Sequence, residues 1–75
     1  MQYYDEFSNI WEQVVEINDS LFEIEGFLKS KNFIGDEYKV SAYCTSQVLQ
    51  AENALERLIN ELGIWLDENY DENDM

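Results

Sequence analysis

The side chains whose type and spacing could do chemistry in this sequence are carboxylates. The chain has 17 Asp and Glu against four Lys and Arg, and it has no His. Five acids near the N-terminus recur at intervals of three, four or seven residues, the spacings that bring side chains to one face of an α-helix. This set, here called the acidic face, comprises Asp5, Glu12, Glu16, Asp19 and Glu23.

Catalysis and metal binding are not expected from these residues. Acids on one helix face diverge instead of converging on a cation, and the chain has no calcium loop of the D-x-[DN]-x-[DN]-G type. General acid–base chemistry needs a pocket that raises the pKa of one carboxyl, which two helices do not offer. Without His, Cys44 has no catalytic partner and is expected to be a small buried residue. We therefore expect a protein that is not an enzyme and has no metal or cofactor.

The acidic face instead approaches the charge density of a nucleic-acid strand. From Glu12 to Glu23 it presents one carboxylate for about every 5 Å of helix axis, within a factor of two of the phosphate spacing in a DNA strand. Like-charged neighbours at i,i+4 each cost roughly 0.2–0.5 kcal/mol, and selection for solubility alone would mix Lys among them. Two interpretations remain: a solvated face, or a surface that imitates nucleic acid and occupies the basic groove of a protein that binds nucleic acid. The shortage of Lys favours the second.

The hydrophobic pattern that must position these acids predicts two helices. Apolar residues alternate at spacings of three and four, the a/d pattern of a coiled coil. The first run comprises Phe7, Ile10, Val14, Ile17, Leu21, Ile24 and Leu28. The second comprises Ser41, Cys44, Val48, Ala51, Leu55, Leu58, Leu62 and Trp65. We expect helices over about 4–30 and 36–68, a turn over 31–35, Asp36 as the N-cap of the second helix, and a fraying acidic tail over 69–75.

A short connection between two long helices makes them antiparallel neighbours, so the expected fold is all-α: a single coiled-coil-like helical hairpin over residues 1–75. Large apolar residues remain outside the a/d seam and form a second stripe. The stripe comprises Trp11, Val15, Phe22, Leu49, Ile59 and Leu66. Because an exposed apolar patch of this extent marks an interface, we expect either dimerisation into a four-helix bundle or docking on another protein.

The net charge of −13 limits the classes of partner that the chain can bind. It argues against direct binding to nucleic acid or to an anionic membrane, where positive charge is needed, and it steers the chain toward basic surfaces. No signal peptide and no apolar run long enough to span a bilayer is present, and the lone Cys suits a reducing compartment. The expected location is the cytoplasm.

In small size, acidity, helical build and aromatic residues near a carboxylate stripe, the chain resembles phage-encoded inhibitors that mimic DNA, including anti-CRISPR and anti-restriction proteins. The resemblance covers general character and no motif. It implies a protein that inhibits a host-defence or host-polymerase protein in the cytoplasm of a bacterial cell. The alternative is an acidic helical adaptor, assembly or immunity protein that binds its partner through the apolar stripe, with the acids only keeping the chain soluble.

Overall fold

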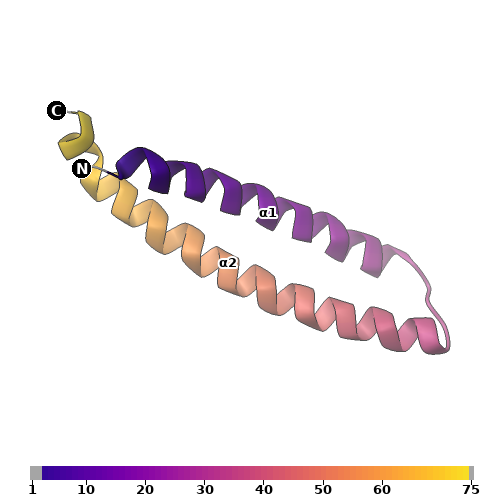
Figure 1. The fold of residues 1–75 in the computed structure, drawn as a ribbon. Helices are drawn as coiled ribbons and strands as arrows, with labels where there is room; N and C mark the ends of the chain where they lie inside the picture. Colours follow the sequence, from indigo (N-terminus) through magenta and orange to yellow (C-terminus); the bar gives the residue numbers. More distant parts are fainter. Residues whose placement is uncertain (1–2, 75) are drawn as a thin grey trace.

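Two long helices joined by a short turn make up the protein. The computed structural model describes the backbone of residues 3–74 and the side chains of residues 3–70. Helix α1 spans Tyr4–Ser30 and helix α2 spans Asp36–Asp74. They run antiparallel along the length of a rod measuring 59 × 15 × 14 Å, lying closest near the chain ends and separating toward the turn (Figure 1). The predicted all-α helical hairpin is confirmed.

The ends of α1 follow from local sequence. Asp5 and Glu6 lie in its first turn and Lys29 in its last, the charge order that the helix dipole favours. The extended backbone of Lys31 ends the helix. The helix therefore occupies the range that its hydrophobic pattern predicts.

The turn ends at Gly35, which has a φ of +64°, a left-handed conformation that glycine adopts without steric cost. Its carbonyl accepts hydrogen bonds from the amides of Tyr38 at 3.2 Å and Lys39 at 3.4 Å. Gly35 thus holds the capping position at the start of α2, and Asp36 is the first helical residue instead of the N-cap that the sequence suggested.

Helix α2 continues to Asp74, so the expectation of a separate acidic tail after residue 68 is not met over 69–74, while Met75 lies outside the described residues. Aromatic contacts account for the first part of this extension. The ring of Tyr70 lies edge-on to that of Tyr4, with 6.4 Å between centroids, and Tyr4 stacks on Trp65 at 6.3 Å. The side-chain amide of Asn69 also donates to the Trp65 carbonyl at 2.8 Å. These contacts involve the uncharged residues of the segment, whose acids alone predict a fraying tail.

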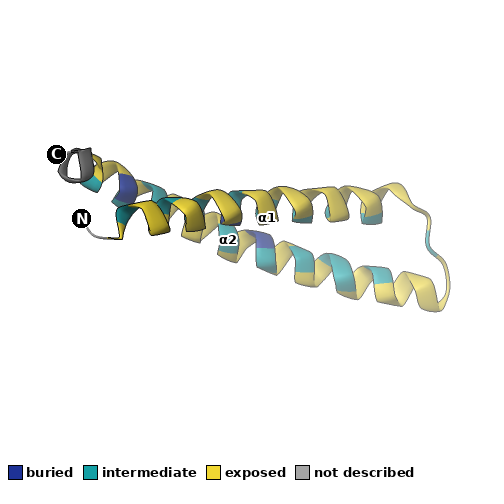
Figure 2. Ribbon diagram, turned by 45° about the horizontal axis from the view of Figure 1, so that its top comes forward, coloured by how far each residue is buried: buried dark blue, intermediate teal, exposed yellow. Residues whose placement is uncertain are grey.

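The hairpin has a very thin core. Among the described residues the only buried apolar side chains are Val14, 9% exposed, and Leu66, 8% exposed. Most of both helices faces solvent (Figure 2). Two helices can cover only one line of side chains on each other, so much of the chain's apolar surface has no cover within the hairpin.

Candidate functional site

The acidic face lies on α1 and is open along its length. All five of its carboxylate residues are exposed, and the helical period places them on the same side of α1. Asp5 marks its start in the first turn, and Glu23 lies about two turns before the end of the helix. The structure therefore places on one face of α1 the five acids whose spacing predicts a shared face.

No base neutralises this face within the described residues. The one ion pair there joins Lys29 Nζ to Glu25 Oε1 at 2.8 Å, and neither residue belongs to the acidic face. Glu12 and Glu16, like Asp19 and Glu23, remain like-charged neighbours one helical turn apart. The face is thus a line of solvated carboxylates whose charge is available to a basic partner.

The second apolar stripe is in large part not a surface. Trp11 turns toward α2, where its Nε1 donates to the Ile59 carbonyl at 2.9 Å. Leu66 is one of the buried residues, and Val15 and Ile59 are half-buried. The expectation that these four residues lie outside the hairpin contact is wrong for Trp11 and Leu66 and holds only in part for Val15 and Ile59.

Phe22 and Leu49 are the two stripe residues that stay exposed. Phe22 is seven residues beyond Val15 and so continues the same line along α1. Phe22 is also one helical turn from Asp19, which puts an exposed aromatic ring beside the acidic face.

Gly63 is what lets Trp11 approach α2. A Cβ atom at residue 63 would lie 3.2 Å from Trp11 Nε1, closer than ordinary van der Waals contact. With only hydrogen at that position, the indole reaches the backbone of the preceding turn and its Nε1 finds the acceptor that a part-buried indole needs. The contact between Trp11 and Gly63 thus helps to set the rotation of α1 about its own axis.

As a result, several residues predicted for the seam face solvent instead. Ile10, Ile17 and Ile24 are 44%, 51% and 46% exposed, and Phe7 in α1 and Leu58 in α2 are also exposed. The other seam residues of α1 are Val14, which is buried, and Leu21 and Leu28, which are half-buried. The seam expectation is therefore wrong for four of the seven residues of α1 and largely right for α2, where Leu58 is its one exposed member.

The exposed residues define a second surface, here called the isoleucine face. It comprises Phe7, Ile10, Ile17 and Ile24 of α1 with Val40 and Leu58 of α2. The three isoleucines are seven residues apart and share one side of α1, and Val40 and Leu58 are five helical turns apart on one side of α2. The hydrophobic pattern assigns these residues, apart from Val40, to the hairpin seam, which is the wrong contact.

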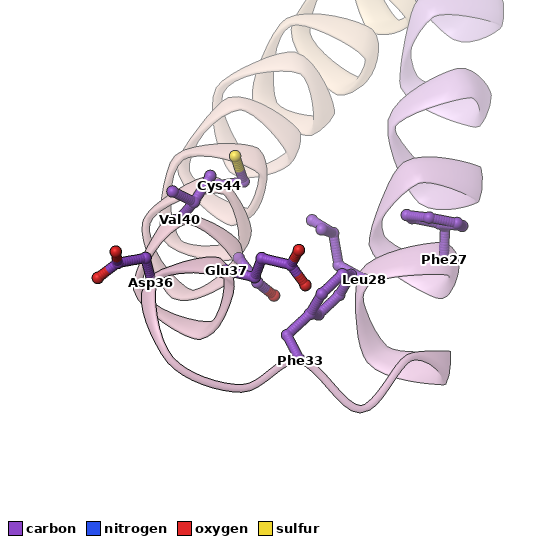
Figure 3. A pocket seen from close by; sticks show the side chains of 8 residues that line it. Phe27, Leu28, Phe33, Asp36, Glu37, Val40 and Cys44 are labelled. Carbon is purple, nitrogen blue, oxygen red and sulfur yellow. The ribbon is translucent and has the colours of Figure 1, made fainter.

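A hollow lies beside the isoleucine face near each end of the hairpin. Near the chain ends Phe7 lines a hollow of about 280 Å³ with Leu62 and Trp65, and the rings of Phe7 and Trp65 meet edge-to-face at 5.3 Å. Near the turn a larger hollow of about 390 Å³ lies between the helices. Phe27 and Leu28 line it from α1, and Val40 and Cys44 line it from α2, with Phe33 of the turn between them (Figure 3).

A polar cluster interrupts the hairpin contact between these ends. The carboxyl of Glu52, a residue only 7% exposed, lies beside that of Glu25. Burial raises the pKa of Glu52 above its usual 4.5, and the neighbouring Glu25 adds to the shift. The hydrogen bond from Lys29 lowers the pKa of Glu25. Buried oxygens of Glu25, Glu52 and Asn18 have no hydrogen-bond partner among the described residues, so this layer weakens the hairpin.

No group of three His, Cys, Asp or Glu side chains capable of holding a metal ion occurs in the described part of the chain. Cys44 is half-buried and a free thiol. Neither described helix has a stretch apolar and long enough to cross a membrane. The described residues display two surfaces, one charged and one apolar.

Comparison with known proteins adds no family: no protein-family model, curated protein or solved structure matches this chain. The functional argument consequently rests on the two faces themselves.

Proposed function

We propose that this protein is a non-enzymatic inhibitor that presents its acidic face to the basic groove of a nucleic-acid-binding protein. The observation that carries the proposal is the unpaired state of that face. Its five carboxylates are exposed on one side of a helix, and the ion pair of the described chain lies elsewhere. Carboxylates in this arrangement can replace phosphates at Lys and Arg contacts.

The spacing and rigidity of the helix support this function. Glu12, Glu16, Asp19 and Glu23 fall within about 16 Å of axis, so a groove that follows a phosphate backbone meets charges at comparable intervals. The helix holds them in place before binding, which reduces the entropy lost on association. Phe22 beside them offers a large aromatic contact, of the kind that supplies affinity once charge has steered the encounter.

The adaptor alternative has less support from the residues of the apolar stripe. Trp11 and Leu66 lie in the hairpin contact and Val15 and Ile59 are half-buried, so the stripe offers a partner mainly Phe22 and Leu49.

The test begins with capture of partners from a nuclease-treated bacterial lysate on the immobilised chain, followed by competition for the identified partner with a DNA duplex. Four substitutions remove the charge of the acidic face: Glu12→Gln, Glu16→Gln, Asp19→Asn and Glu23→Gln. The proposal predicts that the DNA duplex and this chain exclude each other from the partner, and that the affinity of the chain for the partner falls steeply as salt rises. The variant with four substitutions should no longer bind the partner.

A matched variant removes the same amount of charge from α2, through four exposed acids. Its substitutions are Glu56→Gln, Glu61→Gln, Asp67→Asn and Glu68→Gln. It should retain binding, because the change in net charge is the same while the acidic face is intact. Equal loss of binding in both variants would show that net charge, and not the acidic face, determines binding. Binding that the acidic-face variant retains would refute the proposal.

A further inference from the structure

The isoleucine face is an apolar surface for which the hairpin supplies no cover. It extends from the hollow beside Phe7 near the chain ends to the hollow beside Val40 near the turn. Along α1 its isoleucines lie away from the acidic face, since Glu12 and Asp19 each fall two residues beyond an isoleucine, about 200° round the helix. The face is therefore apolar on a chain that is otherwise strongly charged.

We infer that a second copy of this chain covers the isoleucine face, with the two hairpins running antiparallel to form a four-helix bundle. In this arrangement the turn of each copy lies against the chain ends of the other. The inference is independent of the acidic face, which remains on the outside of the bundle and stays available to a partner.

The size of the rod allows such a dimer. Its whole side, 59 Å long and 15 Å wide, has a projected area of roughly 900 Å², so a contact along the rod can reach the 800 Å² or so that each partner buries in a standard interface. A two-fold axis requires a surface that is complementary to itself, and two isoleucine faces of equal length meet this condition. The core of one hairpin, with two buried apolar residues among those described, gives a reason for a second copy.

Charge selects the antiparallel orientation. The end of the rod near the chain termini carries Asp5, Glu6, Asp67 and Glu68 with no base, whereas at the turn end three lysines accompany three acids. The turn-end residues are Glu25, Lys29, Lys31, Asp36, Glu37 and Lys39. A parallel dimer would bring two acidic ends together. The antiparallel dimer places each acidic end beside a neutral end and separates like ends by far more than the roughly 10 Å Debye length.

Sedimentation equilibrium of the whole chain tests the dimer, and the variant Ile10→Gln/Ile17→Gln/Ile24→Gln tests its surface. The wild type should have twice the mass of the chain, and the triple variant should raise the dissociation constant at least about 100-fold. The control Phe22→Gln/Leu49→Gln changes two exposed apolar residues outside the face and should leave that constant within about threefold. A wild type that is monomeric with native helix content would overturn the inference, as would a triple variant that still dimerises.

Because the triple variant could lose its fold along with its partner, a second measurement uses an intact face. A spin label is attached to Asn32→Cys, in the exposed turn, on a Cys44→Ser background. The antiparallel dimer predicts a label-to-label distance of roughly 50 Å, set by the rise along the two helices. A parallel dimer predicts roughly 20 Å, the width of the bundle, and that result would overturn the orientation.

Discussion

Replacing Gly63 with Ala tests the contact that sets the rotation of α1. Ala in a helix interior is normally more stable than Gly by about 0.5–1 kcal/mol, because it restricts the unfolded chain. At Gly63 the added Cβ would lie 3.2 Å from Trp11 Nε1. The indole must move, and its hydrogen bond to the Ile59 carbonyl, 2.9 Å long, is then stretched or lost.

The expected magnitude follows from these two effects. Loss of one such hydrogen bond costs about 0.5–1.5 kcal/mol, which offsets or exceeds the gain in helix propensity. Gly63→Ala should therefore be neutral or destabilising by up to about 1 kcal/mol. Gly26 in α1 is the matched control, because a Cβ there meets nothing within 4 Å. Gly26→Ala should stabilise by the full 0.5–1 kcal/mol or so.

Urea unfolding followed by far-UV circular dichroism, at one protein concentration for all variants, measures the difference. The two variants should differ by about 1 kcal/mol, or about 4–8 °C in Tm for a domain of this size. In a Trp11→Phe background the indole N–H is absent, so Gly63→Ala should recover much of the gain seen at Gly26. If Gly63→Ala and Gly26→Ala gained equal stability in the wild-type background, the role given to the Trp11–Gly63 contact would be refuted.

Three further predictions follow from the same structure. Glu52→Gln should raise Tm at pH 7, because the raised pKa of Glu52 means that its ionised form destabilises the hairpin; this destabilisation is lost as the pH falls through the raised pKa and is absent below the usual value of 4.5. The gain in Tm should shrink in melts well below pH 4.5. Glu25, whose pKa is lowered, loses its contribution to stability at that pH in both proteins. An equal gain in Tm at both pH values would contradict desolvation of Glu52 as the cause. A double-mutant cycle on Phe7→Ala and Trp65→Ala should give a coupling of about 0.5–1.5 kcal/mol from the edge-to-face contact, whereas additive losses would exclude it. The acidic-face variant should unfold at slightly higher urea than the wild type, since it removes two like-charged i,i+4 pairs worth roughly 0.2–0.5 kcal/mol each, and a fall in stability would show that those carboxylates have partners.

Local sequence was enough to predict the elements of this fold. The absence of proline, the recurrence of apolar residues every three or four positions and the glycine before Asp36 placed two helices and their turn. The grouping of the acidic face also needed only the helical period, because Glu12, Glu16 and Asp19 share a side of α1 whatever α1 packs against. The end of α2 was misjudged, since contacts of Tyr70 with the other helix are not visible in the composition of the tail.

The tertiary structure alone decided which side of α1 faces α2. Ile10 and Trp11 are adjacent in sequence and so about 100° apart round the helix, and each begins a line of apolar residues with acceptable spacing. Periodicity cannot rank two such lines. The choice depends on a partner 48 residues away, the Ile59 carbonyl, and on the space that Gly63 leaves for the indole. Because a hairpin can cover only one line, packing Trp11 against α2 leaves the isoleucines outside.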